Sequence, residues 1–299
     1  MQAPSNEAGS PRRAAFGFLL DFQFLIELFV LFNFIVLILD IYLAHSENEF
    51  YWRAEYFPVY FSVVASVILI VALTARQIWR REAVWRDLGY LVGWVAVATG
   101  LAGVIYHLDS QFFYEKTLRS LTYTAPFVAP LALVGIGLLL IMNRMVPATS
   151  REWAGWILLL TLGGFFGNFV LSLADHAENG FYRPIEWLAV ASAAIAVGFL
   201  LVPLIMPVTG GYLALCALVL LFETVIGTVG FVLHNLANLY GPSPRLFENL
   251  ATGAPPLAPL LFANLSVLGW IGLWALSKHL PGQAQAETGN WKMETGNQI

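Results

Sequence analysis

Four histidines, each accompanied by carboxylates, have the most obvious chemistry in this sequence. The stretches "AHSENEFYWRAEY" (44–56) and "DHAENGFYRPIEW" (175–187) each place one Glu two residues after a His and another Glu ten residues after it. Imidazole nitrogen with carboxylate oxygen is the ligand set of Zn²⁺, Mn²⁺ and non-haem iron. Because helix residues i and i+2 point apart, these groups can converge only in a turn or loop. The pattern predicts metal ligands among His45, Glu47, Glu55, His176, Glu178 and Glu186. The alternative is a set of hydrated interfacial and helix-capping residues.

A second pair of histidines follows closely spaced glycines. "GLAGVIYH" (100–107) and "GTVGFVLH" (227–234) place Gly103 four residues before His107 and Gly230 four residues before His234. Small residues allow a helix or a flat cofactor to approach closely. The two histidines are therefore candidate axial ligands of a haem b held between two halves of the protein. The alternative is tight helix packing with a histidine at the helix end.

The elements that must position these residues are membrane helices. The chain has 299 residues, of which 59% are apolar and 11% are charged. Soluble domains are about one quarter charged, so the composition is that of a polytopic membrane protein. Eight apolar segments approach or exceed the roughly 20 residues of a membrane-spanning helix. They are 18–44, 57–78, 88–107, 119–142, 153–174, 185–206, 210–234 and 255–277.

The sequence also contains an internal duplication. At a shift of 131 residues, six of the eleven positions from 45 to 55 are identical. The glycine–histidine motif repeats at a shift of 127, and "APFVAPL" (125–131) matches "APPLAPL" (254–260) at a shift of 129. The predicted fold is all-α, with two tandem four-helix halves, 17–145 and 153–279, related by a pseudo-two-fold axis along the membrane normal. An N-terminal tail (1–16) and a disordered C-terminal tail (280–299) flank them.

The positive charges predict the orientation. Ten Lys and Arg residues lie in the even-numbered loops and the termini, against five in the odd-numbered loops. This asymmetry predicts a multi-pass protein of the cell membrane with both termini in the cytoplasm and all four repeated histidines at the outer face. Acids outnumber bases on that face, which favours cations. We expect the lipid bilayer as a partner and no nucleic acid.

The acidic residues predicted to lie within the membrane are Glu27, Asp40 and Glu223. Intramembrane charges are expensive and indicate function by default. Pro130 and Pro259 coincide at the 129-residue shift, and we expect them to kink the fourth helix of each half.

Three functions fit these patterns. The first is a redox or metal-site protein that exchanges electrons with a quinone or with a partner protein on the outer face. The second is a secondary transporter or channel with its path between the halves. The third is a non-catalytic anchor subunit. The sequence contains no nucleotide-binding loop and no hydrolase or metalloprotease motif, so it does not decide whether the protein is an enzyme.

Overall fold

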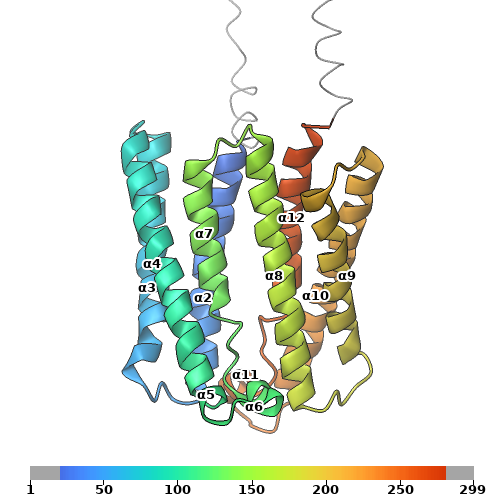
Figure 1. The fold of residues 1–299 in the computed structure, drawn as a ribbon. Helices are drawn as coiled ribbons and strands as arrows, with labels where there is room; N and C mark the ends of the chain where they lie inside the picture. Colours follow the sequence, from blue (N-terminus) through green and yellow to red (C-terminus); the bar gives the residue numbers. More distant parts are fainter. Residues whose placement is uncertain (1–20, 281–299) are drawn as a thin grey trace, which may run out of the picture.

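The computed structural model describes residues 21–280, and these fold into a helical bundle (Figure 1). The predicted tail 1–16, and all of the predicted tail 280–299 except Leu280, lie outside the described residues. The long helices are α2 (Phe22–Ser46), α3 (Tyr56–Gln77), α4 (Glu82–Asp109), α7 (Leu131–Met145), α8 (Arg151–Glu178), α9 (Glu186–Ile205), α10 (Gly210–Leu239) and α12 (Leu260–Ser277). The short helices are η1 (Arg53–Glu55), α5 (Phe112–Glu115), α6 (Leu118–Tyr123) and α11 (Leu246–Thr252).

The bundle has the surface of a membrane protein. Among the described residues, seven helices are long and apolar enough to cross a membrane, and α7, with 15 residues, is a shorter apolar helix. Large apolar side chains such as Phe32, Leu39 and Val67 face outward with more than half of their surface exposed. A soluble monomer does not expose apolar surface on this scale, whereas lipid covers it at no cost. The membrane prediction is thus supported, although only seven of the eight expected spans have full length.

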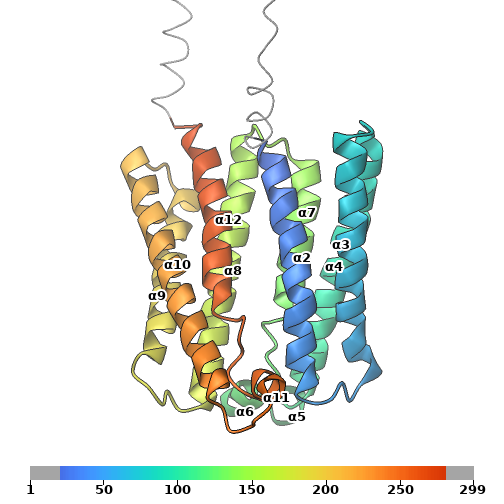
Figure 2. The same cartoon turned by 180° about the vertical axis from the view of Figure 1, so that it is seen from behind.

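The first-half helices lie on one side of the bundle and the second-half helices on the other (Figures 1 and 2). Within the first half α4 packs along α7 and α2 along α3, and within the second half α10 packs along α12 and α8 along α9. The helices α2, α7, α8 and α12 lie in the centre. We call the end of the bundle that carries α5, α6 and α11 the histidine end, because α2, α4, α8 and α10 all finish there. We call the opposite end, where α2 begins and α12 ends, the terminal end.

Short helices connect the halves at the histidine end. Helix α6 of the first half packs on α8 of the second half, and α11 of the second half packs on α2 of the first. Phe247 of α11 reaches Tyr42 of α2, with ring centroids 6.4 Å apart. Each half therefore places the connection between its last two long helices on the first long helix of the other half.

Buried positions recur at the same shifts as the sequence motifs. Phe22, Ile26 and Phe34 of α2 are buried, and so are the residues 131 positions later, Trp153, Ile157 and Phe165 of α8. In α3 and α9, the buried residues Ala65 and Leu69 correspond to Ala196 and Leu200. Equal burial at equal spacing means that corresponding helices use the same face for the core.

The predicted kinks at Pro130 and Pro259 are wrong. These prolines occupy the N-cap positions of α7 and α12, so they begin the helices instead of bending them. In the first half, residues 119–129, which we assigned to the same span, form most of α6 and the turn that follows it. In the second half, residues 255–258 of the predicted span form the turn between α11 and α12. Proline is tolerated at a helix start because the first amide groups have no partner within the helix.

Candidate functional site

The candidate site is built on a turn that occurs twice. His45 lies in the last turn of α2, and its carbonyl accepts a hydrogen bond from the Phe50 amide at 3.0 Å. The His176 carbonyl of α8 accepts the equivalent bond from the Phe181 amide at 2.8 Å. Both turns pass through left-handed backbone, with φ of 52° at Phe50 and 51° at Phe181. The turn reverses the chain directly after each histidine.

An aromatic stack fixes the next helix beside the histidine. Phe50 stacks on Tyr56 with ring centroids 4.3 Å apart, and Phe181 stacks on Trp187 at 3.8 Å. Tyr56 and Trp187 each follow a glutamate, Glu55 and Glu186. The stack therefore brings these glutamates back to the histidines ten residues earlier, which explains why the spacing in the sequence is the same in both copies.

Each histidine faces its glutamate at a distance too long for a hydrogen bond. His45 Nδ1 lies 3.6 Å from Glu55 Oε2, and His176 Nδ1 lies 3.7 Å from Glu186 Oε2. The other oxygen, Oε1, accepts a hydrogen bond from Asn48 Nδ2 in the first copy and from the Arg183 amide in the second. Both Oε2 atoms are buried and lack a hydrogen-bond partner. Buried polar atoms normally have such a partner, so both copies of the site share the same unusual feature, a buried carboxylate oxygen that contacts only a histidine ring.

A second histidine lies next to each pair. His107 Nδ1, on α4, is 2.9 Å from the Pro126 carbonyl oxygen, and His234 Nδ1, on α10, is 2.8 Å from that of Pro255. A carbonyl only accepts, so Nδ1 carries a proton, and in the neutral ring Nε2 is then the atom with the free lone pair. The rings of His45 and His107 lie 6.0 Å apart. His234 is close enough to His176 for their charges to interact.

Each half thus has a His–Glu–His cluster at the histidine end. The first comprises His45, Glu55 and His107, and the second comprises His176, Glu186 and His234. Within residues 21–280, no group of three or more His, Cys, Asp or Glu side chains is arranged so that it could hold a metal ion. The clusters therefore bring possible ligands near one another but do not form a three-ligand metal site in this structure.

No protein-family model, curated protein or solved structure matches this chain.

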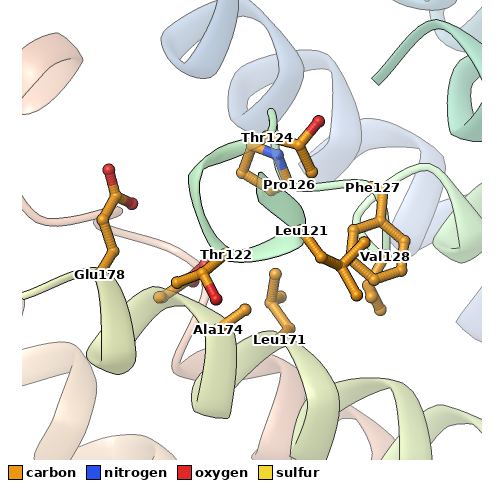
Figure 3. Close-up of a pocket in the computed structure, with 10 residues that line it drawn as sticks. Leu121, Thr122, Thr124, Pro126, Phe127, Val128, Leu171, Ala174 and Glu178 are labelled. Carbon is orange, nitrogen blue, oxygen red and sulfur yellow. The ribbon is translucent and has the colours of Figure 1, made fainter. Parts of the chain in front are cut away.

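Two of the predicted ligands lie apart from the clusters. Glu47 and Glu178 are exposed, and neither makes a hydrogen bond or ion pair with another described residue. Glu178 lines a pocket between α8 and residues 121–128 (Figure 3), together with Thr122, Thr124 and Leu171. Its volume of about 40 Å³ accommodates water but no larger ligand. We therefore retain Glu55 and Glu186, and not Glu47 and Glu178, as site residues.

The glycines expected beside a haem pack against proline. A Cβ atom on Gly103 would lie 2.8 Å from Pro130 Cβ, and one on Gly230 would lie 2.9 Å from Pro259 Cβ. The small residues therefore allow α4 to approach the start of α7, and α10 the start of α12. This packing occupies the space that we had assigned to a flat cofactor, so it disfavours a haem between His107 and His234.

Of the predicted intramembrane acids, Glu27 has a strong partner. Both of its carboxylate oxygens accept hydrogen bonds from the Arg144 guanidinium, at 2.8 and 3.0 Å, and Asn143 Nδ2 donates to Oε1 at 2.9 Å. The Arg144 guanidinium also lies 4.6 Å from the centre of the Trp85 ring. Glu27 therefore has a structural role, joining α2 to α7 near the terminal end.

The other two intramembrane acids have no such partner. Asp40 of α2 is half-buried and makes no hydrogen bond or ion pair among the described residues. Glu223 of α10 is completely buried, and neither of its carboxylate oxygens has a hydrogen-bond partner.

Sequence reasoning missed two sets of partners. The carbonyls of Pro126 and Pro255 orient His107 and His234, and the shared repetition of the histidine and proline motifs could have suggested this pairing. Asn33 of α2 and Asn264 of α12 exchange side-chain hydrogen bonds between the halves, at 2.6 and 3.2 Å. Nothing in the repeat indicates this pair, because Gly164 and Gly135 stand at the corresponding positions.

Proposed function

We propose that this integral membrane protein binds a divalent transition-metal ion at each of its two His–Glu–His clusters. One observation supports this most: Glu55 Oε2 and Glu186 Oε2 are both buried without a hydrogen-bond partner and lie 3.6 and 3.7 Å from a histidine nitrogen. Two ligand atoms bound to one tetrahedral metal at about 2.0–2.2 Å lie roughly 3.4 Å apart. The observed separations are within a few tenths of an ångström of that value.

The third ligand would be Nε2 of His107 or His234. Metal-bound histidines commonly donate their other ring N–H to a carbonyl, which fixes the ring and its tautomer. The Pro126 and Pro255 carbonyls do this for these two histidines. Two imidazoles on one tetrahedral metal, with bonds of about 2.0–2.1 Å, have ring centres roughly 5 Å apart. The His45–His107 separation of 6.0 Å is longer than that, so the two rings would have to approach by about 1 Å on metal binding. Two nitrogens and one oxygen favour Zn²⁺ or a similar divalent metal, with water as a fourth ligand.

Elemental analysis of the purified protein tests this proposal. We expect two metal ions per chain, one in the paired variant His45→Ala/Glu55→Gln and one in His176→Ala/Glu186→Gln. Glu47→Gln is the matched control, because Glu47 is exposed and contacts neither cluster; it should retain both ions. A folded wild-type protein that binds no added Zn²⁺, or an unchanged metal content in both paired variants, would contradict the proposal.

We further propose that the two halves are tandem repeats of the same orientation in the cell membrane, with the histidine end outside and both termini in the cytoplasm. Single cysteines test the topology in a Cys216→Ser background. A membrane-impermeant maleimide added to intact cells should label Glu47→Cys and Glu178→Cys, which lie one in each half. Thr149→Cys, in the loop between α7 and α8, should react only after permeabilisation. The opposite labelling pattern would invert the orientation.

Transport is the second candidate function, because of one specific observation. Glu223 is a fully buried carboxyl with no hydrogen-bond partner in the membrane-embedded part of α10. Intramembrane acids of this kind mark ion and proton pathways. Ion flux into vesicles that contain the protein should then be lost in Glu223→Gln and retained in Glu47→Gln. Equal flux in both variants counts against transport. Electron exchange with a quinone and docking of a partner protein at the histidine end stay predictions from the sequence.

A further inference from the structure

In the described part of the bundle, Glu223 is the acidic residue that is fully buried with both carboxylate oxygens lacking a hydrogen-bond partner. Its residue surface is 0% exposed. It lies eleven residues before His234 on α10, which corresponds to about 16 Å along a helix. Glu223 therefore lies far inside the bundle, away from the His–Glu–His clusters and from the water at either end.

In the described part of the chain, the helices packed against α10 supply no basic residue to neutralise this carboxylate. Helix α10 packs against α9, α11 and α12. The only charged residues in these three helices are Glu186 and Glu248, both of which are acidic, and α10 itself adds only His234 near its end. An ionised Glu223 would therefore be an unpaired charge in an apolar interior, which is strongly unfavourable.

The polar groups around Glu223 are too few to coordinate a metal cation. Ser192 of α9 is close enough to influence Glu223, and the Ser192 hydroxyl donates to its own helix, to the Ala189 carbonyl at 3.2 Å. On the neighbouring helix α12, the hydroxyl of buried Ser266 donates to the Phe262 carbonyl at 2.8 Å. A hard metal ion requires six or more oxygen ligands, or tightly held waters. A proton requires none beyond the carboxyl itself, and a hydroxyl oxygen can still accept from the resulting O–H.

We propose that Glu223 is a proton-binding site inside the membrane-embedded bundle, holding an exchangeable proton. The first half has Ala96 at the corresponding position, so only the second half has this group. A carboxyl that accepts and releases a proton within a membrane is the group that proton-coupled membrane proteins use. The inference does not depend on metal binding at the histidine end.

Dicyclohexylcarbodiimide tests the proposal on the full-length protein in lipid vesicles. This apolar reagent reacts with protonated carboxyls: the acid proton moves to a reagent nitrogen, and the carboxyl oxygen bonds to the central carbon. The product, after rearrangement, is a stable N-acylurea that peptide mass spectrometry detects. We expect modification of Glu223 and none of Glu27. Glu27 is a matched internal control, because it is equally buried but paired with Arg144.

Infrared spectroscopy tests proton exchange directly. The wild-type protein should show a carbonyl band of a protonated carboxyl that shifts in D₂O and is absent from Glu223→Gln. Because the carbodiimide experiment uses wild-type protein, it stays informative even if this variant does not fold. Three results would overturn the proposal: equal modification of Glu27 and Glu223, no difference in the carboxyl band between wild type and variant, or protection of Glu223 by sodium ions.

Discussion

The two halves of this bundle are alike at the histidine end and different inside. At the histidine end, each half has the same turn, the same aromatic stack, and a His–Glu separation of 3.6 or 3.7 Å. Inside, the first half has the Glu27–Arg144 ion pair, whereas Leu158 and Leu273 occupy the corresponding positions of the second half. The second half has Glu223 where the first has Ala96.

This difference separates features that depend on the turn from features that depend on the core. A histidine–glutamate pair held by a local turn keeps its geometry whenever the turn sequence is kept, whatever the core contains. A buried charge needs a partner from another helix, so it can be replaced only together with that partner. This distinction explains why the two halves share the same turns at the histidine end but have different charged residues inside. The following predictions test it.

The largest effect is expected at the buried ion pair. Arg144→Leu leaves Glu27 as an unpaired buried charge, which should lower the free energy of unfolding by about 3–5 kcal/mol. The double variant Glu27→Leu/Arg144→Leu has the residues of the second half at these positions and should recover most of the loss. Thermal unfolding in detergent measures both.

Arg86→Leu is the control for this prediction, because the Arg86–Asp87 ion pair is exposed and should contribute less than about 1 kcal/mol. A double variant as unstable as Arg144→Leu alone would show that the two cores are not interchangeable.

The next largest loss of stability is expected at the glycine–proline contacts, and it should be equal in the two halves. In Gly103→Ala the new Cβ lies 2.8 Å from Pro130 Cβ, and in Gly230→Ala it lies 2.9 Å from Pro259 Cβ. Overpacking of this kind should destabilise each variant by about 1–3 kcal/mol. Gly163→Ala, where a Cβ has no neighbour within 4 Å, is the control and should not destabilise the protein. If the two variants lose clearly unequal amounts of stability, the α4–α7 and α10–α12 contacts are not equivalent.

A smaller effect is expected in the histidine turns. Glu49 adopts a φ of 58°, and Gly180 occupies the corresponding position with a φ of 67°. A non-glycine residue pays an energetic cost of about 1–2 kcal/mol in left-handed backbone. Glu49→Gly should therefore stabilise the first turn by about 1 kcal/mol, which denaturant unfolding can detect. A loss of stability instead would mean that the Glu49 side chain has a role that the structure does not reveal.

The smallest effect is expected between the halves. Replacing Asn33 and Asn264 by leucine, singly and together, removes their mutual hydrogen bonds. Such bonds between membrane helices contribute about 0.6 kcal/mol on average. A double-mutant cycle measured by unfolding should give a coupling energy of that size. A coupling energy of zero would show that the pair does not hold α2 to α12.

Part of the fold follows directly from the sequence. Hydrophobic length predicted the spans, because a helix must cover the bilayer core. His45, His107 and His176 lie in the last turn of their helices as expected, whereas α10 continues past His234 to Leu239. The start of α7 was placed at 119 instead of Leu131, more than three helical turns too early, because apolar residues before Pro130 resemble a continuing helix. Hydropathy does not distinguish an apolar connection from a membrane span.

The site was only partly predictable for a related reason. Glu47 is nearer to His45 in sequence than Glu55 is, yet the left-handed turn directs the chain so that Glu55 reaches the ring. Arg144 was counted among the charges that orient the protein, and its pairing with Glu27 joins residues 117 positions apart. Such contacts arise from the packing of α2 against α7, which composition and spacing do not specify.

The central claim is that two equivalent metal sites lie at the histidine end. Anomalous scattering from crystals of the full-length protein grown with Zn²⁺ tests it most directly. We predict two peaks per chain, one between His45 and Glu55 and one between His176 and Glu186, each about 2.0–2.2 Å from the facing nitrogen and oxygen. Well-ordered clusters without a peak, or zinc bound only elsewhere on the chain, would contradict the claim.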